Sequence, residues 1–177
     1  MEHLPHSDPP KPEELAGCRE WVRQFLQREV QPGLEAAIIK QLATSRWDRD
    51  AVPPHPSPLP QGEGDSHAKP RLIGTGGTAA ILARIEGEVE RYARTRIEAV
   101  RLSLPRVQSH VENLWRSPLQ QRKQIIGLPA SRADVILTGA VIYEAVMEQF
   151  AFSELRVSTR GLRFAAVLHD CGTHVEA

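Results

Sequence analysis

The 177-residue chain has the length of about one domain, and its 22 Lys and Arg residues balance its 22 Asp and Glu residues. This zero formal net charge argues against a protein that coats nucleic acid, but it permits a local phosphate site. Two cysteines are too few for a disulfide framework, and no leader or apolar run of about 18 residues is visible, so we expect a cytoplasmic protein without a membrane span.

The N-terminal part, residues 1–45, is predicted to be helical. Pro12 suits the first position of a helix, where its missing N–H costs nothing. From there, apolar residues recur on one stripe at Leu15, Cys18, Val22, Phe25 and Leu26. We expect Pro32-Gly33 to stop this helix and a second short helix to follow over 34–42.

Residues 46–70 form a Pro-rich insertion. Five prolines and two glycines fall between Ala51 and Lys69, where Val52 and Leu59 are the only sizeable aliphatic residues. Such a segment buries too little to offset its ordering entropy, so we expect disorder. The run also resembles the translated product of a mobile repetitive DNA element, and a polyproline ligand for a partner domain is the alternative.

A strand entering a glycine turn is predicted after Arg71. The turn is Gly74-Thr75-Gly76-Gly77-Thr78, and a helix leaves it to continue through Ile85 and Val89. Glycines permit positive φ and close approach of a ligand, and a helix N-terminus offers free N–H groups, so a phosphate or nucleotide is the natural occupant. The spacing matches neither the dinucleotide fingerprint nor a Walker A loop. A purely structural strand-to-helix corner therefore stays open.

The remaining chain predicts more helix than sheet. Helical segments are expected over 102–115 and 119–126, and Ser131-Arg132-Ala133-Asp134 resembles a capping box that opens an apolar helix from Val135 to Met147. A strand over 155–158 and a closing helix over 160–168 complete the pattern. These strand–helix units predict an α/β domain.

Three ordered motifs resemble the second half of the exopolyphosphatase/guanosine pentaphosphate phosphatase (Ppx/GppA) family. They are the glycine turn with Ala79, then Arg132-Ala133-Asp134-Val135-Ile136 with Gly139-Ala140, then Val157-Ser158-Thr159-Arg160-Gly161-Leu162-Arg163. The segments Arg96-Ile97 and Ile126-Gly127-Leu128-Pro129 are similar to that family's connections. The resemblance covers most of residues 3–168, with residues 71–168 as the family-like lobe and 169–177 as a tail.

The resemblance implies the actin-like ATPase (ribonuclease H-like) fold, whose two α/β lobes close on a phosphate substrate. This chain would be the helix-rich C-terminal lobe, and its substrate would be inorganic polyphosphate or guanosine pentaphosphate. The implied phosphate- or nucleotide-binding residues are Gly74, Thr75, Gly76, Gly77 and Thr78. Arg132, Asp134 and Gly139 would belong to an interdomain helix. Because a mid-helix glycine costs roughly 1 kcal/mol relative to alanine, we expect close approach of another backbone at Gly139.

The family's first phosphate loop, catalytic glutamate and second loop have no counterpart in this sequence. Hydrolysis of a phosphoanhydride needs a polarised phosphoryl group, a positioned water and a general base. We therefore expect no catalytic residue and no metal ligand here, and a truncated chain that is inactive alone. Mg²⁺ would serve the full-length enzyme, and the missing N-terminal lobe would be a partner. A non-catalytic binding lobe acting through a partner, or an unrelated nucleotide-binding enzyme, are the alternatives.

Two residues depart from the family pattern. Thr159 stands where the family usually has Asp, which puts any charge or capping role at that corner in doubt. Ala151 stands where a glycine commonly ends the preceding helix, so this helix end is predicted to be strained or rebuilt. In the tail, His169, Cys171 and His174 are zinc-ligand types, but we interpret them as part of a frayed end.

Overall fold

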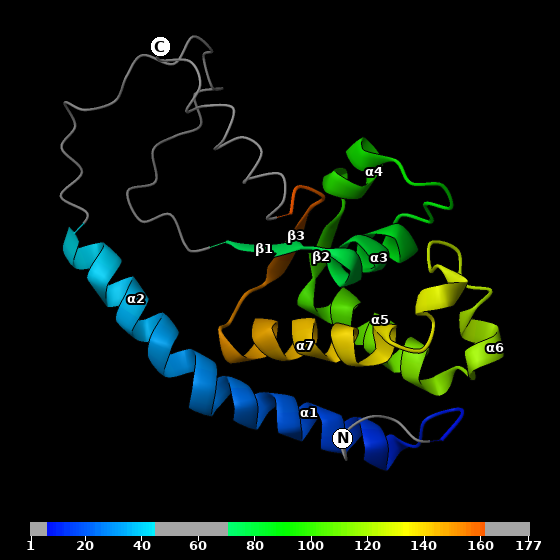
Figure 1. Ribbon diagram of the computed structural model, residues 1–177, viewed down its shortest axis with the longest axis horizontal. Coiled ribbons are helices and arrows are strands. Elements are labelled where there is room, and N and C mark those ends of the chain that lie inside the picture. The colour runs from blue at the N-terminus through cyan, green and yellow to red at the C-terminus, as the bar shows by residue number, and fades with distance from the viewer. Residues whose placement is uncertain (1–6, 45–70, 162–177) are drawn as a thin grey trace, which may run out of the picture.

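The computed structural model describes residues 7–44 and 71–161, and its helices outnumber its strands (Figure 1). The elements in chain order are α1 (Pro12–Phe25), the π-helix η1 (Leu26–Val30), α2 (Gln31–Thr44), β1 (Leu72–Thr75), α3 (Gly77–Glu86), α4 (Arg94–Ala99), β2 (Arg101–Ser103), α5 (Leu104–Arg116), α6 (Leu119–Arg122), the 3-10 helix η2 (Ala130–Arg132), α7 (Ile136–Gln149) and β3 (Glu154–Ser158). None of the described helices is long and apolar enough to span a membrane.

The sheet has three strands in the order β1–β3–β2. β1 pairs with β3 in parallel, with Gly74 opposite Val157, and β2 pairs with β3 in antiparallel, with Leu102 opposite Leu155. Parallel neighbours need a long crossover, which the helices between β1 and β3 supply. The predicted strand over 155–158 is confirmed as part of β3.

Helix α7 occupies the centre of the molecule, between the sheet and α1 (Figure 1). It packs against both α5 and α1, so it is apolar on more than one side. Its fully or nearly buried apolar residues are Ile136, Leu137, Ala140, Val141, Ala145 and Met147. The predicted apolar helix is therefore confirmed, although its start differs.

The prediction that Pro32-Gly33 stops the first helix is wrong. α1, η1 and α2 form one continuous helical segment, and the N–H of Gln31 bonds to the carbonyl of Leu26, five residues back. Pro32 follows this wide turn directly, as the second residue of α2, so the helix continues past a proline where its turns are locally widened. The helix predicted over 34–42 is confirmed within α2, whereas Phe25 of the predicted stripe is 48% exposed.

Helix α3 ends earlier than predicted, at Glu86 rather than beyond Val89. Glu88 has a φ of 48°, and the N–H groups of Glu88 and Val89 bond to the carbonyls of Ile85 and Arg84. This is the hydrogen-bond pattern of a Schellman helix end. Because the left-handed residue at this helix end is Glu88 rather than a glycine, the sequence did not indicate that α3 stops here.

Other predicted elements need correction. Arg101–Ser103 is strand β2 rather than helix, α4 was not predicted, and the helix expected over 119–126 ends at Arg122. The expected capping box over 131–134 is absent from the described structure, because these residues form η2 and a turn before α7. The Asp134 carboxylate instead accepts the neighbouring N–H of Val135. The 46–70 insertion, the tail and nearly all of the predicted closing helix lie outside the described residues.

Candidate functional site

The glycine turn between β1 and α3 has the predicted strand–turn–helix form. Gly76 has φ 90° and ψ −170°, a region of backbone space that is essentially restricted to glycine. Apart from Gly76 and its two chain neighbours, no described atom lies within 4 Å of a Cβ placed on Gly76, so conformation rather than crowding requires this glycine. The turn thus delivers the chain into α3 with its backbone open on one side.

Gly74, in contrast, is a packing glycine. A Cβ placed there would lie 2.9 Å from the Ala79 Cβ and 3.0 Å from side-chain carbons of Tyr143 and Leu155. The carbonyl of the next residue, Thr75, accepts the Tyr143 hydroxyl at 3.3 Å. Burial raises the pKa of Tyr143, so this hydroxyl stays a donor. These contacts fix the end of β1 against α7.

A pocket of about 240 Å³ opens at the start of α3; we call it the α3–α7 pocket. It brings together residues of two motifs that lie more than fifty positions apart in the sequence. Its lining residues are Gly77, Thr78, Ile81, Arg132, Val135 and Ile136. Of the predicted site residues, the structure therefore gathers Gly77, Thr78 and Arg132, while Gly74, Thr75 and Gly76 lie outside the lining.

The donors of the α3–α7 pocket suit an anion. No described side chain caps the N-terminus of α3, because the N-cap residue is Gly76. The first N–H groups of a helix have no partner within it, and the helix dipole adds partial positive charge there. Arg132 adds a guanidinium from η2. Backbone amides and an arginine fork are the usual donors to a phosphate.

The lining residues do not fit a magnesium ion. Mg²⁺ prefers carboxylate and carbonyl oxygens, and none of the described residues that line the pocket carries a carboxylate. Within 7–44 and 71–161, no group of three or more His, Cys, Asp and Glu side chains is placed to hold a metal ion. Asp134 is exposed, bonds to its own turn and does not line the pocket.

Gly139 of α7 lies at the packing contact between α7 and α3. A Cβ placed on it would lie 2.7 Å from the Thr78 Oγ1 and 2.8 Å from the Thr78 Cγ2. The predicted close approach is thus present, but a threonine side chain makes it rather than another backbone. Thr78, which also lines the pocket, thus has its side chain against α7.

Three aliphatic lining residues, Ile81, Val135 and Ile136, were missed by sequence reasoning. Ile81 could have been found, because it follows Gly77 by four positions and therefore lies on the same face of α3. Val135 is 55% exposed, whereas Ile136 is 2% exposed. Their place in the lining depends on where α7 begins, which the false capping box concealed.

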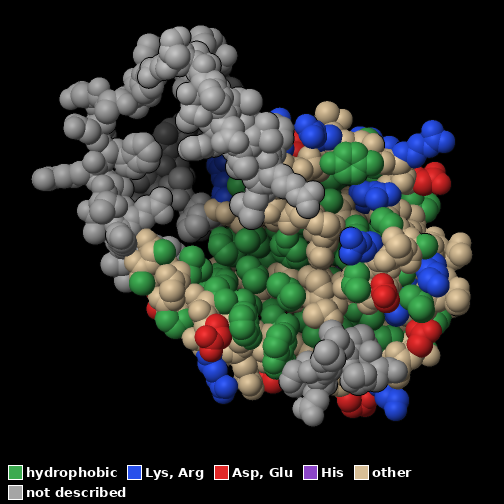
Figure 2. Space-filling view, in the orientation of Figure 1, with side chains coloured by type: hydrophobic (Ala, Val, Ile, Leu, Met, Phe, Trp, Pro, Cys, Tyr) green, Lys and Arg blue, Asp and Glu red, His purple; other side chains and the backbone are tan. Residues whose placement is uncertain are grey.

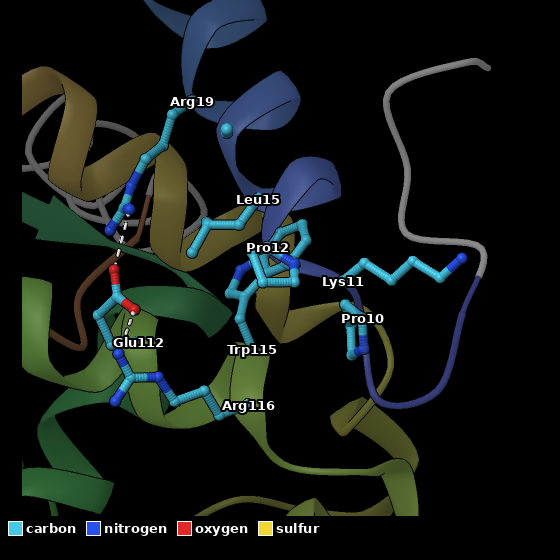
Figure 3. Close-up of a pocket in the computed structure, with 9 residues that line it drawn as sticks. Pro10, Lys11, Pro12, Leu15, Arg19, Glu112, Trp115 and Arg116 are labelled. Atoms are coloured by element: carbon cyan, nitrogen blue, oxygen red, sulfur yellow. Dashed lines mark hydrogen bonds and ion pairs between the residues drawn. The ribbon is translucent and has the colours of Figure 1, made fainter.

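A second pocket, of about 210 Å³, lies between α1 and α5 (Figure 3); we call it the α1–α5 pocket. Figure 3 shows the guanidiniums of Arg19 and Arg116 on either side of the Glu112 carboxylate, at 2.9 and 3.2 Å. Arg19 also donates two hydrogen bonds, of 2.8 and 2.7 Å, to Glu144 of α7. The Lys11 side chain extends away from this row of charges.

The Arg19–Glu144 pair is a buried contact between α1 and α7. The Glu144 side chain is 2% exposed and that of Arg19 is 29% exposed. The hydrogen bonds from Arg19 raise the pKa of that arginine, and burial raises the pKa of Glu144. Both arginines beside Glu112, Arg19 and Arg116, are therefore already paired with carboxylates.

Thr159 has a clear role at its corner. Its N–H and its hydroxyl both donate to the Glu98 Oε1, at 2.9 and 2.6 Å. These hydrogen bonds lower the pKa of Glu98. A carboxylate at position 159 would face Glu98 with like charge and could not donate, so the departure from the family pattern is matched by a local partner.

A family model described as the Ppx/GppA phosphatase family matches residues 17–174. Two solved structures of the Aquifex aeolicus family member are similar in fold, with TM-scores of 0.70 and 0.67 at 21% and 22% identity, covering 99% and 95% of this chain. An exopolyphosphatase structure from Cytophaga hutchinsonii gives a TM-score of 0.54 at 24% identity over 89% of this chain. No curated protein matches.

The chain spans less than half the length of these solved structures: 46%, 44% and 40% of their chains. At such identities the likeness shows the fold. It confirms the predicted helix-rich α/β fold of the actin-like ATPase class and the resemblance to a C-terminal part.

Proposed function

The chain belongs to the Ppx/GppA phosphatase family, and on that premise we propose that it is the C-terminal part of a phosphohydrolase that cleaves terminal phosphoanhydrides. The substrate is inorganic polyphosphate or guanosine pentaphosphate, and the protein acts in the cytoplasm. In this proposal the chain supplies an anion-binding side of the site rather than the reacting groups.

One observation carries the proposal: the start of α3 and Arg132 converge on the α3–α7 pocket. The N–H groups of Gly77 and Thr78 donate to phosphate oxygens, and the Arg132 guanidinium adds its donors from η2. Charge-assisted bonds of this kind are about twice as strong as neutral ones, so the set favours a multiply charged phosphate. Gly76 keeps a Cβ out of the approach.

The same lining leads us to propose a division of labour, in which this chain binds the phosphate and the rest of the family fold cleaves it. A general base and magnesium ligands require carboxylates, and none of the described lining residues offers one. We propose that the remainder of the family fold supplies both, together with the water that attacks. The chain alone then holds a phosphate without cleaving it.

An exposed apolar surface supports the proposal that a second lobe binds to this chain. Figure 2 shows hydrophobic side chains gathered on one face, over α7 and the adjoining N-terminal helical segment. Large apolar side chains with more than 40% exposure include Trp21, Phe25, Ile73 and Ile142. Contiguous apolar surface usually marks an interaction site, and we propose that the missing lobe covers it.

Calorimetric titration of the purified chain with tripolyphosphate, beside an assay of phosphate release with Mg²⁺, tests the proposal. We expect binding in the millimolar range or tighter, no release, and about tenfold weaker binding for Arg132→Gln. Arg116→Gln, in the α1–α5 pocket, is the matched control and keeps wild-type affinity. Turnover by the chain alone would reject the division of labour, and no binding at millimolar ligand would reject the phosphate site.

A further inference from the structure

We propose that Arg122 is a positioning residue for the α3–α7 pocket: it holds, from inside the protein, the turn that carries Arg132. The inference rests on the proposed function, because it takes Arg132 as a ligand of the phosphate. It concerns a residue that does not line the pocket and that no motif singled out.

Arg122 is one of the few buried charged residues of the described chain, at 4% exposure. Its guanidinium is held by backbone carbonyls. The Nε donates to the Ala133 carbonyl at 2.8 Å, and Nη1 donates to the carbonyls of Ser117 at 2.5 Å and Leu114 at 3.4 Å. The Asp8 carboxylate is 3.9 Å from Nη2. Burial lowers the pKa of Arg122, as expected where carbonyl dipoles do most of the compensation.

These bonds act beside the hydrogen bond of 3.3 Å from the Trp115 indole to the Leu137 carbonyl, and they alone of the two hold the turn before α7 at Ala133. Leu114 and Ser117 belong to the end of α5, whereas Ala133 follows η2 directly. The planar fork of an arginine can reach both segments at once, which a single ammonium cannot do. Arg122 therefore links the end of α5 to the turn before α7.

That turn supplies half of the pocket. Arg132, Val135 and Ile136 are three of the six lining residues, and Ala133, whose carbonyl Arg122 holds, lies between them in sequence. Ala133 is fully buried, so its backbone is the inner anchor of a turn whose other side faces the pocket. Hydrogen bonds weaken steeply with distance and angle, so a small shift of this turn moves the Arg132 guanidinium out of reach of a phosphate.

A purely structural role for Arg122 makes a different prediction. In that case its replacement lowers the stability of the fold but leaves the affinity of the folded molecules unchanged. A positioning role acts through Arg132, so the effects of the two substitutions on affinity cannot be independent.

The experiment is a double-mutant cycle with tripolyphosphate as the probe. Arg122→Lys keeps the charge, and Arg132→Gln removes the proposed ligand; each is titrated alone and combined, well below the melting temperature measured for each variant. We expect each single variant to bind about tenfold more weakly, and the double variant to bind no more weakly than Arg132→Gln. Arg116→Lys, an equally conservative change at an exposed arginine, keeps wild-type affinity.

Two outcomes would overturn the inference: a lower melting temperature with unchanged affinity, or losses that multiply in the double variant. If Arg122→Lys does not fold, Arg122→Gln at reduced temperature, with the Ala151→Gly helix-end substitution added, serves the same cycle. If Arg132→Gln itself binds like the wild type, the proposed function fails rather than the link through Arg122.

Discussion

The α1–α5 pocket and the α3–α7 pocket contain arginines in very different circumstances. In the α1–α5 pocket, Arg19 and Arg116 share the Glu112 carboxylate, and Arg19 is further bound to Glu144. In the α3–α7 pocket, Arg132 stands beside a helix start that no described side chain caps. The first pocket contains more charge, but both of its arginines are already paired with carboxylates.

The difference shows that a count of cations does not identify an anion site. What matters is donor capacity that the protein leaves unused, because a ligand must compete with the partners already present. The α1–α5 pocket serves the stability of the α1–α7 contact, whereas the α3–α7 pocket retains its capacity for a ligand. Four substitutions test this contrast.

Arg19→Met is expected to have the largest effect on stability. It leaves the buried Glu144 carboxylate without its arginine, and removal of one partner of a buried pair costs about 3–5 kcal/mol. The free energy of unfolding in urea measures the loss, while tripolyphosphate affinity should be unchanged. The double variant Arg19→Met/Glu144→Leu should recover most of the stability.

The loss in Arg19→Met should also depend on pH. Burial raises the pKa of Glu144 in the folded chain, and the hydrogen bonds from Arg19 oppose that rise. Without Arg19 the folded pKa of Glu144 should be higher still, so the folded variant binds a proton there more readily than the folded wild type. The deficit should therefore be smallest in acidic buffer and should grow as the pH rises from the folded pKa of the wild type through that of the variant. A deficit below about 1 kcal/mol at neutral pH would show that the pair is not the support of α1 inferred above.

Gly139→Ala should come next, with a net loss of about 1–2 kcal/mol. The new Cβ meets the Thr78 side chain at 2.7 Å, and this overpacking exceeds the roughly 1 kcal/mol that alanine gains in helix propensity. Since Thr78 also lines the α3–α7 pocket, phosphate affinity should fall as well. Thr78→Ala in the same chain removes the clashing atoms and should restore stability; independent, additive losses would contradict the contact.

Ala151→Gly should stabilise the chain by about 0.5–1 kcal/mol without affecting either pocket. Ala151 has a φ of 54°, and the N–H groups of Ala151 and Phe152 bond to the carbonyls of Glu148 and Met147. Glycine adopts this left-handed position of a Schellman helix end more easily, although it gains freedom in the unfolded chain. Glu88→Gly is the parallel test at the end of α3. Lower stability in both variants would argue against these backbone conformations.

Arg116→Gln should have the smallest effect. Its side chain is 77% exposed, and an exposed pair with Glu112 contributes about 0.3–0.5 kcal/mol. Neither the melting temperature nor tripolyphosphate affinity should change measurably. A clear loss of phosphate binding would transfer the anion site to the α1–α5 pocket and would reverse the contrast.

The part of the site that the sequence predicts is the part built from local backbone. The turn at Gly76 needs a conformation that glycine alone adopts easily, so its motif indicates the strand, the turn and the helix start together. The strain predicted at Ala151 is confirmed for the same reason, since a helix end is a local structure. Gly139 marked a close approach correctly, but the predicted partner, another backbone, is wrong, because the Thr78 side chain makes the contact.

The rest depends on contacts between residues far apart in the chain. Arg19 and Glu144 are separated by 125 positions, and Glu144 lies in a helix whose pattern is otherwise apolar. Arg122 gives no periodic signal, because its partners are carbonyl groups that every residue has. The continuation of the helix past Pro32 likewise depends on a π-turn that propensity does not encode.

The most direct test of the central claim is an NMR titration of the ¹⁵N-labelled chain with tripolyphosphate. The account predicts that the largest shifts occur at the backbone amides of Gly77 and Thr78 and at the Arg132 side-chain N–H. The Arg19 and Arg116 signals should barely move. Shifts centred on the α1–α5 pocket, or no shifts at millimolar ligand, would contradict it.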